Sequence, residues 1–226
     1  MVIVAPAAGG NPAQLYDAES GLGTAHNGAV SRLAWAHPAH GMLATSGLDG
    51  VVRFWREVKA QSWQCVYRHQ VPSNASGLAF APREYGLILA IACIDGSVTL
   101  CEYVAAKGDW AESKISAHDG AVISVSWAAA TQPQLLKAES VDIAADQKLE
   151  SNIVQRFVTC SADGKVKVWA LDAGGEYECV NDLTAGGKFD GAVSDVAWSR
   201  ATGINADYVA AVGEDETVQV WKSDLQ

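Results

Sequence analysis

The stretch Asp49-Gly50-Val51-Val52-Arg53-Phe54-Trp55 decides the fold, because the chain repeats it. Two further copies keep both the first Asp and the last Trp: Asp163-Gly164-Lys165-Val166-Lys167-Val168-Trp169 and Asp215-Glu216-Thr217-Val218-Gln219-Val220-Trp221. A fourth copy, Asp95-Gly96-Ser97-Val98-Thr99-Leu100-Cys101, has Cys in place of Trp. Apolar residues stand three and five positions after the Asp in every copy, which predicts a turn that opens a half-buried β-strand.

A second sequence motif, which we call the phrase, precedes these turns and keeps a constant spacing from its Gly to its Trp. It occurs as Gly28 to Trp35, Gly120 to Trp127 and Gly191 to Trp198, with Ser73 to Phe80 as a weaker equivalent. A third apolar strand is predicted between phrase and turn, at residues 42–46, 87–93, 154–160 and 208–212. An outer strand after the turn completes each unit.

Four antiparallel strands that recur about every 45 residues are typical of propeller blades, each of which buries its faces only against its neighbours. We therefore predict an all-β, open β-propeller with about five blades' worth of strands, four nearly complete and one partial. It forms a single incomplete propeller over residues 1–226, in the approximate repeats 1–20 (partial), 24–68, 69–115, 116–183 and 184–226.

The phrases resemble WD repeats, and the resemblance covers almost the whole chain. It implies that a His, the turn Asp, a strand Ser or Thr and the Trp form a hydrogen-bonded set, since a buried acid needs donors. Phe189 replaces the His in the last repeat, so we expect that set to be incomplete and that blade looser. The expected structural struts are His26, Asp49, Trp55, Asp95, His118, Asp163, Trp169, Asp215 and Trp221.

Two features depart from a regular ring. Residues 128–151 form an inserted loop in which Leu135, Leu136, Val141, Ile143 and Leu149 allow a short amphipathic helix, and such loops often bind partners. Residues 2–7 and 13–17 resemble strands of a preceding blade that lacks its inner strand, and no outer strand follows Trp221. We expect open strand edges, covered either by more of a longer chain or by strands that a partner donates.

Four stretches of the sequence resemble one WD-repeat family in particular. These stretches are Trp35-Ala36-His37-Pro38, Ala39 to Ser46, Phe80 to Ala90 and Gln155-Arg156-Phe157-Val158. They are similar to the small propeller subunit shared by the outer coat of COPII vesicles and the Y-shaped scaffold of the nuclear pore. A related nucleoporin propeller of the same pore complex is the nearest alternative.

The resemblance implies a structural subunit in ER-to-Golgi transport and in the nuclear pore complex. A large scaffold protein, either the rod-forming COPII subunit or a pore scaffold nucleoporin, donates a blade to the open propeller. The edge nearest that blade would lie along Val2, Ile3, Val4, Leu15 and Tyr16. The implied location is cytoplasmic, on COPII vesicles and the cytoplasmic face of the ER membrane, and at the nuclear pore.

Charge, hydropathy and cysteine use argue against several other classes of protein. A formal net charge of -10 disfavours nucleic acid as a ligand, and no run of eighteen apolar residues occurs that could span a membrane. The resemblance implies membrane contact only through the coat. The five cysteines show no CxxC spacing and indicate buried free thiols in a reducing compartment. Asn74-Ala75-Ser76 matches a glycosylation sequon, but we interpret it as a turn.

We expect no enzyme, cofactor or metal. His37 and His40 lack further ligands at a suitable spacing, and Cys160, in the same repeat as His118, lies on a Val-rich strand typical of inert core. No nucleotide-binding or hydrolase motif occurs. The remaining alternative is a peptide-binding WD adaptor, for which only the insertion and Arg53 offer loop residues.

Overall fold

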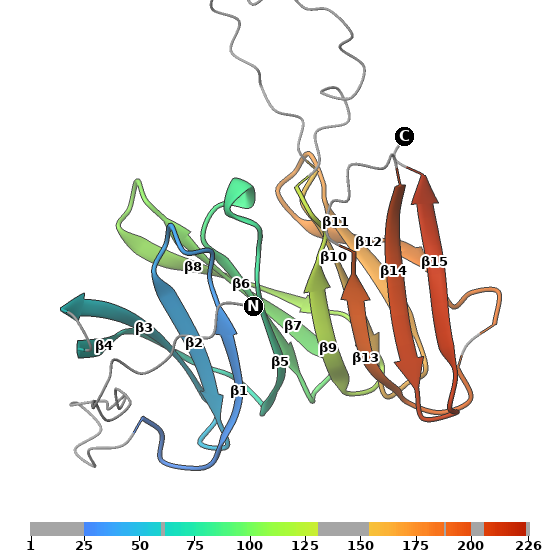
Figure 1. Cartoon of the computed structure of the whole chain (residues 1–226), viewed down its shortest axis with the longest axis horizontal. Helices are drawn as coiled ribbons and strands as arrows, with labels where there is room; N and C mark the ends of the chain where they lie inside the picture. Colours follow the sequence, from blue (N-terminus) through green and yellow to red (C-terminus); the bar gives the residue numbers. More distant parts are fainter. Residues whose placement is uncertain (1–24, 60–61, 131–153, 188, 200–205, 225–226) are drawn as a thin grey trace, which may run out of the picture.

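The computed structural model describes residues 25–59, 62–130, 154–187, 189–199 and 206–224. Within them four antiparallel sheets stand side by side in an arc, in chain order from β1 to β15 (Figure 1). The innermost strands β1, β5, β9 and β13 are neighbours in that order. The prediction of an all-β, open propeller is confirmed.

Each sheet follows the order of the chain from an inner to an outer strand, and three of the four have four strands. The first sheet contains β1 (Val30–Trp35), β2 (Met42–Gly47), β3 (Val51–Lys59) and β4 (Ser62–Gln70); the second contains β5 (Ala75–Phe80), β6 (Ile88–Cys93), β7 (Ser97–Val104) and β8 (Asp109–Ser116). The third sheet contains β9 (Val122–Trp127), β10 (Arg156–Ser161), β11 (Val166–Leu171) and β12 (Tyr177–Asp182); the fourth contains β13 (Val193–Trp198), β14 (Ala206–Gly213) and β15 (Val218–Asp224).

The repeated Asp-Gly turns join the second and third strands of each sheet. Gly50, Gly96 and Gly164 have φ angles of 74°, 85° and 78°, a region that glycine enters at little cost. In the last repeat Glu216 occupies the same position with φ 64°, and it is the only non-glycine residue with positive φ in the described part of the chain. The fourth turn therefore carries a backbone strain that the other three avoid.

A register irregularity recurs at the same place in all four sheets, where the inner strand pairs with the second strand. It lies between Val30 and Arg32, Ala75 and Gly77, Cys160 and Ser161, and Val193 and Asp195. A bulge adds twist to the pair, and its repetition gives the four sheets the same local geometry. This common twist lets consecutive sheets stack in an arc.

The core lies between consecutive sheets and follows the repeat. Val52 and Phe54 of β3 belong to a cluster with Leu89 and Ile91 of β6. The equivalent pairs continue the pattern, with Val98 and Leu100 packed in the cluster of Val122 and Val125, and Val166 and Val168 in that of Val193 and Val196. The third strand of each of the first three sheets is therefore covered by the following sheet.

Several predicted features lie outside the described residues. These are the partial repeat 1–20, with the proposed edge residues Val2, Ile3, Val4, Leu15 and Tyr16, and most of the insertion with its expected amphipathic helix. A short 3-10 helix, η2 (Arg83–Tyr85), is the one helical turn among the described elements. None of the described residues forms a helix long and apolar enough to span a bilayer.

Replacing Glu216 with Gly should stabilise the chain. The substitution removes the left-handed strain of a side chain with φ 64°, which costs roughly 1–2 kcal/mol per residue. The greater freedom of glycine in the unfolded chain offsets part of this, so we expect a net gain of about 0.5–1 kcal/mol in urea unfolding.

The matched control is Glu214→Gly, an exposed acidic residue two positions earlier without positive φ. This variant should be slightly less stable than the wild type, because only the entropic cost remains. Equal shifts in the two variants would show that the turn at Glu216 stores no strain.

Candidate functional site

The first sheet contains a complete hydrogen-bonded set beneath its turn. His26 Nδ1 lies 3.1 Å from Asp49 Oδ1, and its Nε2 lies 2.7 Å from the Thr45 hydroxyl. The Trp55 indole donates to the same hydroxyl at 2.8 Å. Arg53 Nη1, which only donates, lies 2.8 Å from the same Nδ1, so the tautomer of His26 decides whether Nδ1 donates to Asp49 or accepts from Arg53. Strands β2 and β3 are thereby tied to the chain that precedes β1.

Asp49 is held as an anion by further donors. Its side chain is nine per cent exposed and accepts from Arg53 at 2.8 Å and from the Asn27 amide at 3.0 Å. Burial by itself raises the pKa of a carboxyl, but the bonds from Asn27, His26 and Arg53 outweigh it and hold the pKa of Asp49 far below its usual range. Arg53 is buried, so it does not supply an exposed contact for a peptide.

The third sheet repeats this arrangement with the equivalent residues. His118 contacts Asp163 at 3.1 Å and the Thr159 hydroxyl at 2.8 Å, and the Trp169 indole donates to Thr159 at 2.9 Å. Burial lowers the pKa of His118, and the Asp163 carboxylate only partly opposes this effect. Both ring nitrogens of His118 are therefore occupied by structural contacts.

The second and fourth sheets lack the set. In the second sheet Val71, Ile91 and Cys101 stand where the first has His26, Thr45 and Trp55. Asp95 bonds instead to Ser97 and, at 3.2 Å, to Lys114. In the fourth sheet Phe189 and Ala211 replace the His and the Thr, so the Trp221 indole has no Thr hydroxyl at this position. Asp215 accepts from the Asp190 amide and from Thr217.

The cysteine considered as a nucleophile is part of the core. Cys160 is fully buried, its thiol contacts the Val193 carbonyl at 3.6 Å, and burial raises its pKa to about 12. The ring of His118 is directed to Asp163 and Thr159. The arrangement provides no thiolate and no available base, as a nucleophilic site requires.

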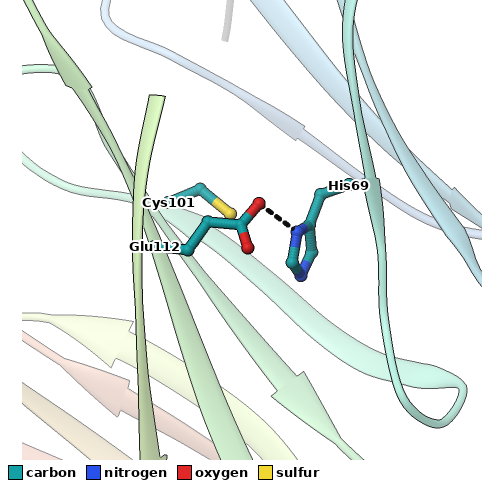
Figure 2. Close-up of side chains that lie close together, drawn as sticks. All are labelled: His69, Cys101 and Glu112. Atoms are coloured by element: carbon teal, nitrogen blue, oxygen red, sulfur yellow. Dashed lines mark hydrogen bonds and ion pairs between the residues drawn. The ribbon is translucent and has the colours of Figure 1, made fainter. Parts of the chain in front are cut away.

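The metal candidates that the sequence suggested do not gather further ligands. His37 Nδ1 accepts from the Ala39 amide in a surface turn, and His40 is in no group of three ligand residues within the described chain. A different group does come together: His69, Cys101 and Glu112 (Figure 2). Sequence reasoning missed it, because only the Cys at the Trp position of the second repeat marked this place.

The fourth sheet presents an apolar face with no cover among the described residues. Val218 and Val220 of β15 are 66 and 62 per cent exposed, although the equivalent pairs in the three other sheets are buried. Val212 of β14 pairs with Val218 and is also exposed. We call Val212, Val218 and Val220 the trailing face.

The first sheet presents the complementary face at the other end of the arc. Leu33 and Trp35 of β1 are 64 and 59 per cent exposed. The equivalent residues of the third and fourth sheets are buried and those of the second sheet are half-buried. The Trp127 indole donates to the Ala79 carbonyl of the preceding sheet. We call Leu33 and Trp35 the leading face. Each of the two faces has the side chains that fit a further sheet.

The ends of the insertion are fixed by a single tyrosine. The Tyr85 hydroxyl lies 3.4 Å from the carbonyl of Ala129, at the start of the insertion, and 3.3 Å from the carbonyl of Val154, which follows the insertion. Burial raises the pKa of Tyr85 to about 12, so the hydroxyl stays a donor at neutral pH. The stretch containing Tyr85 in the second repeat thus anchors the loop of the third.

The four sheets, their repeated turns and their Trp-containing sets define the class of protein: a WD-repeat β-propeller. The WD domain, G-beta repeat family matches residues 20–56 and 139–170.

Relatives with the same repeat extend the match over most of the chain. "Protein transport protein sec13" of Aspergillus oryzae is 35% identical over 211 residues, which cover 88% of this chain and 67% of the relative. "Protein SEC13 homolog" of Drosophila melanogaster is 34% identical and "Protein transport protein SEC13-2" of Candida glabrata is 36% identical, with 54% and 63% of their lengths covered. The chain belongs to the Sec13 family, and it spans between about half and two thirds of the length of these relatives.

Replacing Thr159 with Val should destabilise the third sheet. Valine has nearly the same shape but removes the hydroxyl shared by His118 and Trp169, which leaves two buried polar groups without a partner. Each such group costs about 1–3 kcal/mol, so we expect a loss of about 2–4 kcal/mol in urea unfolding.

Thr217→Val serves as the control for this variant, since Thr217 is exposed in the fourth sheet and its hydroxyl donates to the exposed Asp215 turn rather than to buried groups. Its effect should stay within about 0.5 kcal/mol. Similar losses in both variants would mean that the set beneath the turn contributes nothing particular to stability.

Acid should destabilise the protein in two stages. Burial holds the pKa of His118 in the folded chain below its ordinary value of 6.5, so the unfolded chain binds more protons and stability falls as the pH drops below about 6.5. The lowered pKa values of Asp49 and Asp163 add a second loss as the pH falls below about 4.

Urea midpoints measured between pH 8 and pH 3 test this order. In His118→Phe, which copies Phe189 of the fourth sheet, the decline between about pH 6.5 and 5 should become shallower, while the decline at lower pH remains. A His118→Phe profile parallel to that of the wild type would contradict the assignment.

Proposed function

We propose that this chain is a non-catalytic scaffold subunit of the COPII vesicle coat, which acts in ER-to-Golgi transport, and of the nuclear pore complex. Membership of the Sec13 family and the names of its relatives as protein transport proteins support this role. The described polar clusters beneath the turns are engaged in holding strands together, as a structural subunit needs.

The observation that carries the proposal is the pair of open apolar faces. Val218 and Val220 are mostly exposed, although three equivalent pairs are covered by the following sheet. Fully burying a Val side chain stabilises by roughly 1.5–3 kcal/mol, so covering this face contributes several kcal/mol to whatever packs on it. A subunit that works by accepting a further sheet has a reason to present such faces.

The partner is a large scaffold protein that donates a blade. It is the rod-forming COPII subunit or a pore scaffold nucleoporin, and its blade lies near the edge formed by Val2, Ile3, Val4, Leu15 and Tyr16. The leading face, Leu33 and Trp35, lies at the end of the arc where the first described sheet stands. Sheet-on-sheet packing with main-chain pairing at the edges supplies affinity without an active site.

The mechanical role follows from how the sheets are linked. Each sheet buries one face in the next, so the arc bends only at the cost of core contacts and behaves as a stiff joint. Such a joint holds a cage edge at a set angle and contacts the membrane only through the coat. We place it in the cytoplasm on COPII vesicles and the ER surface, and at the nuclear pore.

Two other functions remain as alternatives. A related nucleoporin propeller of the same pore complex would use the same open faces with a different scaffold partner. A peptide-binding adaptor would use the inner strands, where Arg32, Ser76, Ser124 and Asp195 line a hollow of about 340 Å³. That hollow carries both charge signs, which suits a peptide, but Arg32 already donates to the Ser76 carbonyl at 2.6 Å.

The test is to measure the solution mass and thermal melting of the chain, alone and with the blade-donating segment of the coat's rod-forming subunit. We expect concentration-dependent self-association alone and a one-to-one complex with a higher melting temperature in the mixture. At a segment concentration one hundred times the dissociation constant, binding adds about 2.7 kcal/mol of stability.

The double variant Ile3→Asp, Val4→Asp should weaken this complex, because it places charges on the proposed edge. Val180→Asp is the control, since Val180 is an exposed residue of the outer strand β12, away from both open faces. If the chain is a stable monomer that does not bind the segment, the scaffold proposal is wrong. The peptide-binding adaptor then becomes the favoured function.

A further inference from the structure

Three strands of two sheets bring His69, Cys101 and Glu112 together. His69 lies on β4 of the first sheet, Cys101 on β7 and Glu112 on β8 of the second. One ring nitrogen of His69, the Cys101 thiol and a Glu112 carboxylate oxygen all lie within 4.8 Å of one another. Figure 2 shows the three side chains pointing toward one another across the gap between the sheets.

The cluster arises from a departure in the repeat. In the first and third sheets the Trp faces a Cys across the outer strand pair, as Trp55 faces Cys65 and Trp169 faces Cys179. In the second sheet Cys101 takes the Trp position and faces Glu112. The smaller side chain replaces a large ring at a fully buried position, and an ionisable pair stands where the other sheets have an indole.

The hydrogen bonds present do not satisfy the cluster. His69 Nδ1 lies 2.5 Å from Glu112 Oε1, and the Tyr67 hydroxyl donates to the same oxygen at 2.6 Å. The His69 side chain is only nine per cent exposed, and its Nε2 is buried without a hydrogen-bond partner among the described residues. Such a buried polar nitrogen without a partner is uncommon in folded proteins. It is a different atom from Nδ1, the ring nitrogen that faces Glu112.

We propose that His69, Cys101 and Glu112 form a zinc site that links the outer strands of the first and second sheets. Imidazole nitrogen, thiolate sulfur and carboxylate oxygen are the donors that Zn²⁺ takes, whereas Mg²⁺ and Ca²⁺ prefer oxygen alone. Three protein ligands leave a fourth position for water.

The surroundings allow an ion to enter. His69 and Glu112 line a hollow of about 360 Å³ together with Pro72, Thr99, Ser113 and Lys114. Lys114 is the cation at this rim, and its ammonium lies 3.2 Å from Asp95, which partly neutralises it. The side chain of Glu112 is 42 per cent exposed and is therefore free to reorient, while Cys101 is fixed in the core.

Binding requires a small rearrangement and the release of one proton. Ligand atoms around tetrahedral zinc lie about 3.3–3.7 Å apart, so the His69 ring and the Glu112 carboxylate must separate by roughly 1 Å. Burial and the Glu112 charge raise the pKa of Cys101, so its thiol is protonated without metal. Zn²⁺ displaces that proton to solvent and forms the S–Zn bond, with no change of oxidation state.

The experiment titrates the metal-free chain with Co²⁺ as a spectroscopic substitute and with Zn²⁺ in competition. We expect one equivalent of Co²⁺ to produce a thiolate-to-cobalt charge-transfer band that Zn²⁺ abolishes, since Zn²⁺ binds such sites more tightly. Zn²⁺ should also raise the melting temperature, because it binds the folded chain.

The variants Cys101→Ala and Glu112→Gln separate the site from general thiol binding. Cys101→Ala should lose the band, and Glu112→Gln should weaken Co²⁺ binding by at least about tenfold. Cys93→Ala is the matched control, since Cys93 is equally buried in the same sheet but is not in the cluster, and it should bind Co²⁺ like the wild type.

Cys101→Ala changes a buried residue and could prevent folding. Glu112→Gln keeps the thiol and changes a partly exposed residue, so it tests the site in a folded chain. Absence of the band in the folded wild type, or a band that survives in Cys101→Ala, would overturn the site. An affinity unchanged in folded Glu112→Gln would also overturn the three-ligand assignment.

Discussion

Burial of one sheet's face by the next is the constraint on which the structure depends. Val52 and Phe54, Val98 and Leu100, and Val166 and Val168 occupy the same repeat positions and are each covered by the following sheet. No sheet has a closed core of its own, so stability grows with each added neighbour. The same rule makes the uncovered pair Val218 and Val220 a surface that favours association.

The hydrogen-bonded sets beneath the turns add precision to this packing. His26, Thr45, Asp49 and Trp55 tie three parts of the first sheet together, and the third sheet repeats the arrangement. The fourth sheet has Phe189 and Ala211 instead, and its turn adopts positive φ at Glu216. The sheet that presents the trailing face thus lacks the complete hydrogen-bonded set.

Both proposals concern joints between sheets. The proposed scaffold function uses the leading and trailing faces, where exposed apolar side chains would be buried by a further sheet. The proposed zinc site lies between the first and second sheets, where His69, Cys101 and Glu112 come together. In the second sheet the usual Asp, His, Thr and Trp set is gone, so a metal ion there would restore a polar tie that the repeat has lost.

The sequence by itself determined the strands, the turns and the His, Asp and Trp of the sets in the first and third repeats, because these depend on short spacings that recur along the chain. Phe189 in the His position already identified the incomplete last set. Only the tertiary structure decided which faces remain open, since the exposure of Val218 and Leu33 depends on whether a neighbouring sheet is present. The meeting of His69 with Glu112 was likewise invisible, because the two lie 43 positions apart on different sheets and no local pattern links them.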